Sequence, residues 1–261
     1  IGSETTIRGF NAFALRDPIC CRIRECMQYG KTLEDYAERL QKRNSGDYAC
    51  SWMFGDTRGK PRIMRVELGL NYVNVETTRN GVFIGFNSTY DERIRNIECT
   101  DALSSKAATG ATGAGAIDAG GSGGSGWRDV SSSIGNRRVQ LEKLTEKYRG
   151  RIDTDVVKRI LADHYDNHLG KSSPNTRTVC KHGYESGAEV GGGGGAPYKP
   201  VGAYDTKIAD SALAKRMSFL AHWGPPCGTP FSVKEHMKKH PEWKDWAEHL
   251  VDFPRRGWVN V

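Results

Sequence analysis

The segment His164-Tyr-Asp-Asn-His168 sets two imidazoles four residues apart. On a helix this spacing puts both rings on one face, where they could bind zinc as in HExxH helices. The middle acid is displaced by one position from that motif, and the sequence indicates no third ligand. The alternative is a partly exposed polar face shared with Asp163 and Asp166. We favour the polar face, and we expect no metal and no organic cofactor in this chain.

The cysteines offer thiol chemistry in several places. Vicinal Cys20 and Cys21, with Cys26, could form a redox or metal cluster, but adjacent cysteines rarely bind one metal without further ligands. Semi-buried thiols on a helix are the favoured interpretation. The chain has seven cysteines and no CxxC pair, which argues against a zinc ribbon and leaves at least one thiol outside any internal pairing. Their number does not fix the redox compartment.

A polar series with substrate-binding potential runs through residues 44–56. The turn Asn44-Ser-Gly precedes a short predicted strand that places Tyr48, Cys50 and Trp52 on one face. Asn87 ends another predicted strand, where its amide would be well placed to hold a substrate oxygen. Asn87-Ser-Thr is also an N-glycosylation sequon, so both interpretations stay open at this point.

Two short acids and one arginine in the second half of the chain are candidates for a buried ion pair. Arg177 precedes a glycine-rich stretch at about 187–196. Asp205 and Asp210 follow that stretch, in an otherwise apolar segment. We expect Arg177 to pair with an acid in this region and brace the site. Ordinary surface charge is the alternative.

Composition limits the class of protein. The chain has 261 residues and a formal charge of +7, but its basic residues are scattered among acids. This pattern favours solubility over nucleic-acid binding. No apolar run reaches the length of about 18 residues that a membrane span needs. Glycine-rich stretches at about 101–126 and 187–196 cannot bury a core, and we interpret them as flexible surface insertions.

Local signals predict the elements that must position these residues. Asp17-Pro18 opens a helix that runs to about Tyr29. Thr32 and Asp35 have capping-box spacing for a second helix. Strands are predicted in 1–10, 47–56, 63–68 and 81–87, and further helices at 133–148, from N-cap Asp153, at 232–240 and at 241–251; residues 204–219 mix both signals.

Four of these segments occur together in a known group of proteins: Asn44-Ser-Gly-Asp-Tyr48, Ile84-Gly-Phe-Asn87, Asn175-Thr-Arg-Thr-Val-Cys180 and Gly202-Ala-Tyr-Asp-Thr-Lys-Ile-Ala-Asp210. The chain resembles the phospholipase B-like (lamina-ancestor-like) proteins. These are related to penicillin acyltransferase-type autoproteolytic N-terminal-nucleophile hydrolases. The resemblance implies an α+β fold, an αββα sandwich with glycine-rich loop insertions, forming a single domain over residues 1–261.

The resemblance also implies a mechanism. In this family a precursor cuts itself to release an N-terminal Cys, whose thiol attacks an amide or ester carbonyl. Ile1 has no nucleophilic side chain, so the nucleophile is expected upstream, in a segment or chain that completes the sheet. Asn44, Cys50 and Asn87 would line the cleft, with Tyr48, Arg177 and Asp205 as structural support. Relatives tend to carry Asn at the position of Cys50, and a thiol is a weaker donor to an oxyanion.

Two functional hypotheses follow. The first is an acyl hydrolase, either an amidase or a phospholipase B-like enzyme, completed by the upstream segment. The second is a catalytically degenerate relative that serves as a structural or interaction subunit of a larger assembly or homo-oligomer. In this family the position of Asn87 is more consistent with a structural or site-lining amide than with a glycan. The resemblance points to a secretory, lysosomal or extracellular setting.

Overall fold

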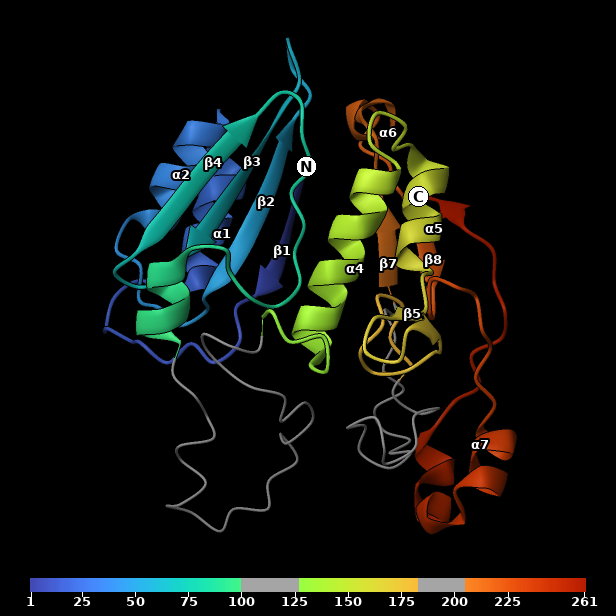
Figure 1. Cartoon of the computed structure of the whole chain (residues 1–261). Helices are drawn as coiled ribbons and strands as arrows, with labels where there is room; N and C mark the ends of the chain where they lie inside the picture. Colours follow the sequence, from blue (N-terminus) through green and yellow to red (C-terminus); the bar gives the residue numbers. More distant parts are fainter. Residues whose placement is uncertain (100–126, 183–204) are drawn as a thin grey trace, which may run out of the picture. The chain divides into compact units, whose positions relative to one another are not determined.

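The computed structural model describes residues 1–99, 127–182 and 205–261 (Figure 1). The chain divides into two compact units, which are described separately. Of the described residues, unit 1 comprises 1–99 and Trp127, and unit 2 comprises 128–182 and 205–261. The sequence predicts a single domain over residues 1–261, and this remains a prediction. Both predicted glycine-rich insertions, at about 101–126 and 187–196, lie outside the described residues.

Unit 1 is built on a four-stranded antiparallel sheet in the order β1-β2-β3-β4. Its strands are β1 (Gly2–Thr6), β2 (Cys50–Asp56), β3 (Arg62–Leu68) and β4 (Val73–Thr78). The predicted turn near Gly55–Gly59 joins β2 to β3, and Gly59 there adopts the positive φ that such turns favour. Alternation along β2 puts Cys50, Trp52 and Phe54 on one buried face, as the sequence predicts.

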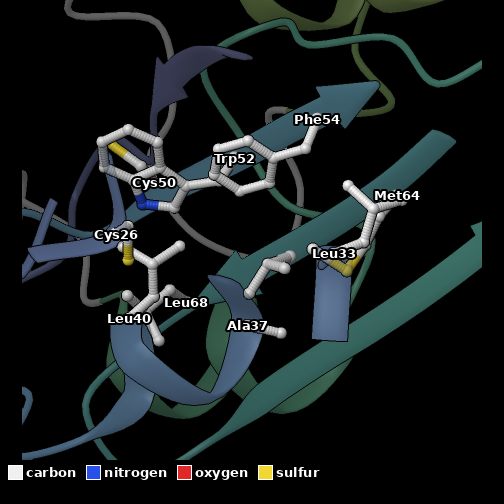
Figure 2. Packing of buried hydrophobic residues seen from close by; sticks show 10 residues of the cluster. Cys26, Leu33, Ala37, Leu40, Cys50, Trp52, Phe54, Met64 and Leu68 are labelled. Atoms are coloured by element: carbon white, nitrogen blue, oxygen red, sulfur yellow. The ribbon is translucent and has the colours of Figure 1, made fainter. Parts of the chain in front are cut away.

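Two helices pack their apolar sides against that face. They are α1 (Ile19–Tyr29) and α2 (Leu33–Gln41). The predicted cap of α2 is confirmed, because the Thr32 hydroxyl accepts from the Asp35 backbone N–H. Figure 2 shows Leu33, Ala37 and Leu40 of α2 lying against side chains of β2 and β3. Leu33, Ala37 and Leu40 are spaced four and three residues apart, so they form one apolar stripe of α2 that packs into the core of unit 1.

The strand predicted over 81–87 is wrong. The sheet instead ends with β4, and a π-helical turn η1 (Ile94–Glu98) follows later. Residues 81–87 lie beside β1 through single contacts, including Arg8 N–H to Asn87 O at 3.2 Å. At Gly85 an added Cβ would fall 2.6 Å from Thr5 Cγ2, and Asn87 has φ 64°. The segment therefore packs closely against Thr5 at Gly85 and turns at the left-handed Asn87, and it does not form a regular ladder of β-sheet hydrogen bonds.

Unit 2 mixes helices with two small sheets. The helices α4 (Ser133–Lys147) and α5 (Thr154–Leu161) begin at the N-caps Ser132 and Asp153. The antiparallel sheet β7-β8-β9 and the hairpin β5-β6 follow. The remaining bounds are β5 (Tyr165–Asp166), β6 (Lys171–Ser172), β7 (Asp205–Ile208), α6 (Ser211–Lys215), β8 (Leu220–Trp223), α7 (Val233–Lys239), the 3-10 helix η4 (Pro241–His249) and β9 (Val259–Asn260).

The helices predicted at 133–148, from N-cap Asp153 and at 232–240 are confirmed as α4, α5 and α7. Asp210 caps α6 after β7, which accounts for the mixed strand and helix signals over 204–219. The segment predicted as a helix over 241–251 is a 3-10 helix with no buried residue. Among the described parts of the chain, no helix combines the length and apolarity that crossing a membrane requires.

Candidate functional site

Asn44 holds the turn before β2 through both ends of its side-chain amide. Its side-chain Nδ2 donates to Gly69 O, and its Oδ1 accepts from Gly46 N–H at 3.0 Å. Gly46 has a positive φ, and an added Cβ would fall 2.4 Å from Ala12 O. The amide of Asn44 is buried and engaged at both ends, so it fixes the backbone entering β2.

Tyr48 and Cys50 converge on a carboxylate that sequence reasoning missed. The Cys50 thiol donates to Glu4 Oε2 at 3.1 Å, and the Tyr48 hydroxyl donates to Glu4 Oε1 at 3.3 Å. Tyr48 also shares a 2.7 Å hydrogen bond with the Thr6 hydroxyl. Burial, followed by the Glu4 carboxylate, raises the pKa of the Cys50 thiol far above its usual range. Cys50 is therefore a neutral thiol here, not a thiolate nucleophile.

Asn87 lies next to this group, on the far side of β1. Its Nδ2 donates to Thr6 O at 3.3 Å, and its backbone N–H donates to Thr5 Oγ1 at 3.1 Å. Tyr48 and Cys50 thus share Glu4 of β1, and Asn87 contacts Thr5 and Thr6 of the same strand, while Asn44 binds the backbone of a different loop. The nitrogen that a glycan would occupy is the one that contacts Thr6.

A hollow of about 570 Å³ opens beside this group in unit 1. Glu4, whose carboxylate accepts from Tyr48 and Cys50, is one of the residues that line the hollow. The size falls within the usual range for small-molecule sites. Its apolar lining comes from α1, α2 and β2: Ile23, Met27, Leu33, Tyr36, Trp52 and Phe54.

In unit 2 the predicted arginine forms a buried ion pair, but with an acid that we had placed on a polar helix face. Arg177 Nη2 lies 2.7 Å from Asp166 Oδ2, and Nε lies 3.0 Å from the same atom. Asn175 donates to that oxygen as well. Burial raises the pKa of Asp166, but the hydrogen bonds from Arg177 and Asn175 outweigh it and hold the pKa below its usual range.

Of the two acids predicted as partners of Arg177, the structure describes the side chain of Asp210 only. Asp210 caps α6 by accepting from Leu213 N–H at 2.7 Å. The backbone of Asp205 pairs with Trp223 in the sheet of β7 and β8, and its side chain lies outside the described atoms. The expected kind of interaction is therefore present, with Asp166 as the acid.

A second cluster in unit 2 combines two histidines and two cysteines. His164, Cys180, His182 and Cys227 place their ligand atoms all within 4.8 Å of one another. His182 Nε2 lies 3.0 Å from His164 Nε2, 3.3 Å from Cys180 Sγ and 3.4 Å from Cys227 Sγ. Cys180 and His182 are fully buried, whereas His164 and Cys227 are half-buried at the edge. We call these four residues the Cys2His2 cluster.

Three segments of backbone hold the Cys2His2 cluster. His164 follows the end of α5, and Cys180 N–H donates to the neighbouring Asp163 O at 3.0 Å. His182 N–H donates to Asn175 O at 2.9 Å. Cys227 lies in a turn after β8, where Gly228 has φ 75° and Thr229 N–H points to the Cys227 sulfur at 3.4 Å.

Contacts within the cluster stabilise the thiolate of Cys227. Hydrogen bonding from Cys180 is the largest cause that holds the pKa of Cys227 far below its usual range, and His164 and His182 add to it. A sulfur that is ionised among imidazoles is in the state in which thiols bind metals.

The predicted pairing of His164 with His168 on one helix face is wrong. Helix α5 ends at Leu161, and residues 165–166 already form strand β5. His164 and His168 therefore do not share a helix face, and only His164 belongs to the Cys2His2 cluster. The sequence did offer one signal that we did not use: Cys180-Lys-His182 places two ligand types within three residues.

No family model matches the chain, and no curated protein or solved structure matches it.

Proposed function

We propose that this chain is the part downstream of the nucleophile in an N-terminal-nucleophile acyl hydrolase that cleaves an amide or ester bond. The observation that carries the proposal is the hollow of about 570 Å³ in unit 1, which is lined by apolar side chains and by Glu4. Apolar walls suit an acyl chain. Carboxylate oxygens accept hydrogen bonds, so Glu4 suits an N–H or O–H of the substrate.

The layers of each unit support the same proposal. Unit 1 pairs an antiparallel sheet with α1 and α2, and in unit 2 the helix α5 contacts β7 of the antiparallel sheet. An αββα sandwich contains two halves of this kind, each with helices on one side of a sheet. The resemblance in the four quoted segments supplies the expected nucleophile, a Cys upstream of residue 1, and its α-amine as base.

The test is expression of the full-length gene, with the upstream segment included. We expect self-cleavage immediately before a Cys, detected by intact-mass and N-terminal peptide mass spectrometry. We also expect a covalent adduct at that Cys with an acyl-ester probe. Replacing that Cys by Ala should abolish both signals and serves as the control. A full-length protein that folds but neither cleaves itself nor forms the adduct would contradict the enzyme proposal.

A second candidate function is a structural or interaction subunit that descends from such an enzyme. The observation in its favour is that the predicted cleft amides serve the protein itself: Asn44 holds a turn, and Asn87 holds β1. Under this proposal the full-length protein stays uncleaved and forms a stable assembly, with itself or with a partner. Native mass spectrometry of the purified full-length protein distinguishes this outcome from an active, cleaved enzyme.

A further inference from the structure

We propose that His164, Cys180, His182 and Cys227 bind one zinc ion as a structural Cys2His2 centre. The first argument is distance. Zinc bonds of about 2.0 Å to nitrogen and 2.3 Å to sulfur give a tetrahedron with edges of roughly 3.3–3.8 Å. The contacts of His182 Nε2 with the other three ligand atoms measure 3.0, 3.3 and 3.4 Å. Three of the six edges are therefore close to the lengths that one tetrahedral ion imposes, and the other three are no longer than 4.8 Å.

The second argument is that hydrogen bonds alone do not account for these contacts. An imidazole nitrogen carries either one hydrogen or one lone pair, so it makes one good hydrogen bond. His182 Nε2 has three neighbours at 3.0–3.4 Å, and one of them is the Nε2 of a second imidazole. The two rings meet at 72° with centroids 4.8 Å apart, and their Nε2 atoms are 3.0 Å apart, so the two rings meet through these nitrogens. A cation at that point would be bound by all four atoms at once.

The ligand types select the metal and its role. Two thiolates and two imidazoles in a tetrahedron are a preferred set for zinc. All four positions are filled by protein, whereas catalytic zinc sites keep one for water or substrate. The ion would thus tie together the end of α5, the segment 175–182 and the turn after β8. This role is independent of the hydrolase proposal, because it concerns the stability of unit 2.

A disulfide between Cys180 and Cys227 is the main competing arrangement. It would use the two sulfurs but leave His164 and His182 with their nitrogens 3.0 Å apart in a largely buried place. It would also leave the contact from Thr229 N–H to the Cys227 sulfur unexplained, whereas backbone N–H groups commonly support metal-bound thiolates. Zinc accounts for all these contacts together.

The test begins with the metal content of the full chain. The protein is expressed in zinc-supplemented medium, purified under reducing conditions, dialysed and measured by inductively coupled plasma mass spectrometry. We expect about one zinc per chain, the number that a single four-ligand site holds. Exchange with Co²⁺ should then give the visible spectrum of tetrahedral cobalt with thiolate charge-transfer bands. This spectrum reports the ligands directly and needs no variant.

Matched variants then identify the ligands. His164→Asn and Cys180→Ser should each weaken zinc binding by at least about tenfold in competition with a chelating dye, because even the outer partners of ligands have effects of that size. His168→Asn and Cys20→Ser, which change the same residue types outside the cluster, should leave the affinity unchanged. Three results would overturn the proposal: wild-type protein without zinc or a tetrahedral cobalt spectrum, a Cys180–Cys227 disulfide recovered after reducing purification, or equal loss in the control variants.

Discussion

The Nε2 atoms of His164 and His182 lie 3.0 Å apart, although 18 residues separate them in the sequence. The contact exists because α5 stops at Leu161 and the chain returns through the hairpin β5-β6. His182 N–H then binds Asn175 O and Cys180 N–H binds Asp163 O, which places His182 beside the end of α5. A turn of the chain, and not a helix face, thus brings the metal-ligand side chains together.

Removing the metal should destabilise the protein. A ligand that binds only the folded state, present at a hundredfold excess over its dissociation constant, adds about 2.7 kcal/mol to the free energy of unfolding. We therefore expect chelation of zinc to lower the unfolding temperature of the full chain in scanning calorimetry. His164→Asn is the control, because a chain that has lost the site should unfold at the same temperature with and without the chelator. An unchanged wild-type transition would contradict a structural role for the ion.

Local signals were enough for much of the fold. The cap at Thr32, the stripe Leu33-Ala37-Leu40 and the alternation along β2 each depend on neighbours in sequence, and all three are confirmed. The strand expected at 81–87 failed because its conformation is set by contact with β1, about 80 residues earlier. The same limit applies to Glu4, which joins Tyr48 and Cys50 only through the pairing of β1 with β2.

The Cys2His2 cluster shows the same limit more strongly. Its ligands come from three segments spread over residues 164–227, and no fixed spacing joins them. The His164–His168 spacing was the visible pattern, and it misled because the helix ends before either residue. Arg177 was correctly expected to pair with a buried acid, but the identity of that acid depends on the hairpin β5-β6.

Breaking the ion pair of Arg177 should be costly. Asp166 is fully buried, so Arg177→Met leaves a carboxylate without its charged partner. Removing one partner of a buried pair typically costs about 3–5 kcal/mol of unfolding free energy. Arg149→Met is the matched control, since Arg149 and Glu146 form an exposed pair, and exposed pairs contribute little to stability. Urea unfolding of both variants measures the difference, and similar losses would contradict the role assigned to Asp166.

The same carboxylate should make stability depend on pH. The pKa of Asp166 is lower in the folded chain than its usual value, so the folded state favours the ionised form. The stability it contributes is therefore complete above the unfolded pKa of about 3.9 and is lost as the pH falls through the folded pKa. The difference in unfolding free energy between wild type and Asp166→Asn should shrink below about pH 3.9. A difference that grows with acid would contradict this sign.

The core of unit 1 offers a test with a closely matched control. Leu40 on α2 is fully buried, and Leu15 is 94% exposed. Leu40→Ala should cost about 2–5 kcal/mol because it removes buried methyl groups and leaves a cavity. Leu15→Ala should stay within about 0.5 kcal/mol. Chemical denaturation monitored by tryptophan fluorescence can follow this loss, because Trp52 belongs to the same core. Equal costs would mean that the packing around α2 has been misassigned.

Replacing Cys50 by Asn tests the hydrolase proposal, because Cys50 is the weakest hydrogen-bond donor among the residues expected to line the cleft. The thiol lies 3.1 Å from Glu4 and is held neutral, so it is a poor partner for an oxyanion. An amide could keep the hydrogen bond to Glu4 and offer a second N–H. If the site acts as the resemblance implies, Cys50→Asn in the full-length protein should raise the rate of acylation by an ester probe by about 100- to 1000-fold.

Cys50→Ser, which has one donor only, is the control and should leave that rate within about tenfold of the wild type. Stopped-flow measurement of single-turnover acylation gives the rates. A folded Asn variant no faster than the Ser variant would show that Cys50 does not face the reacting carbonyl.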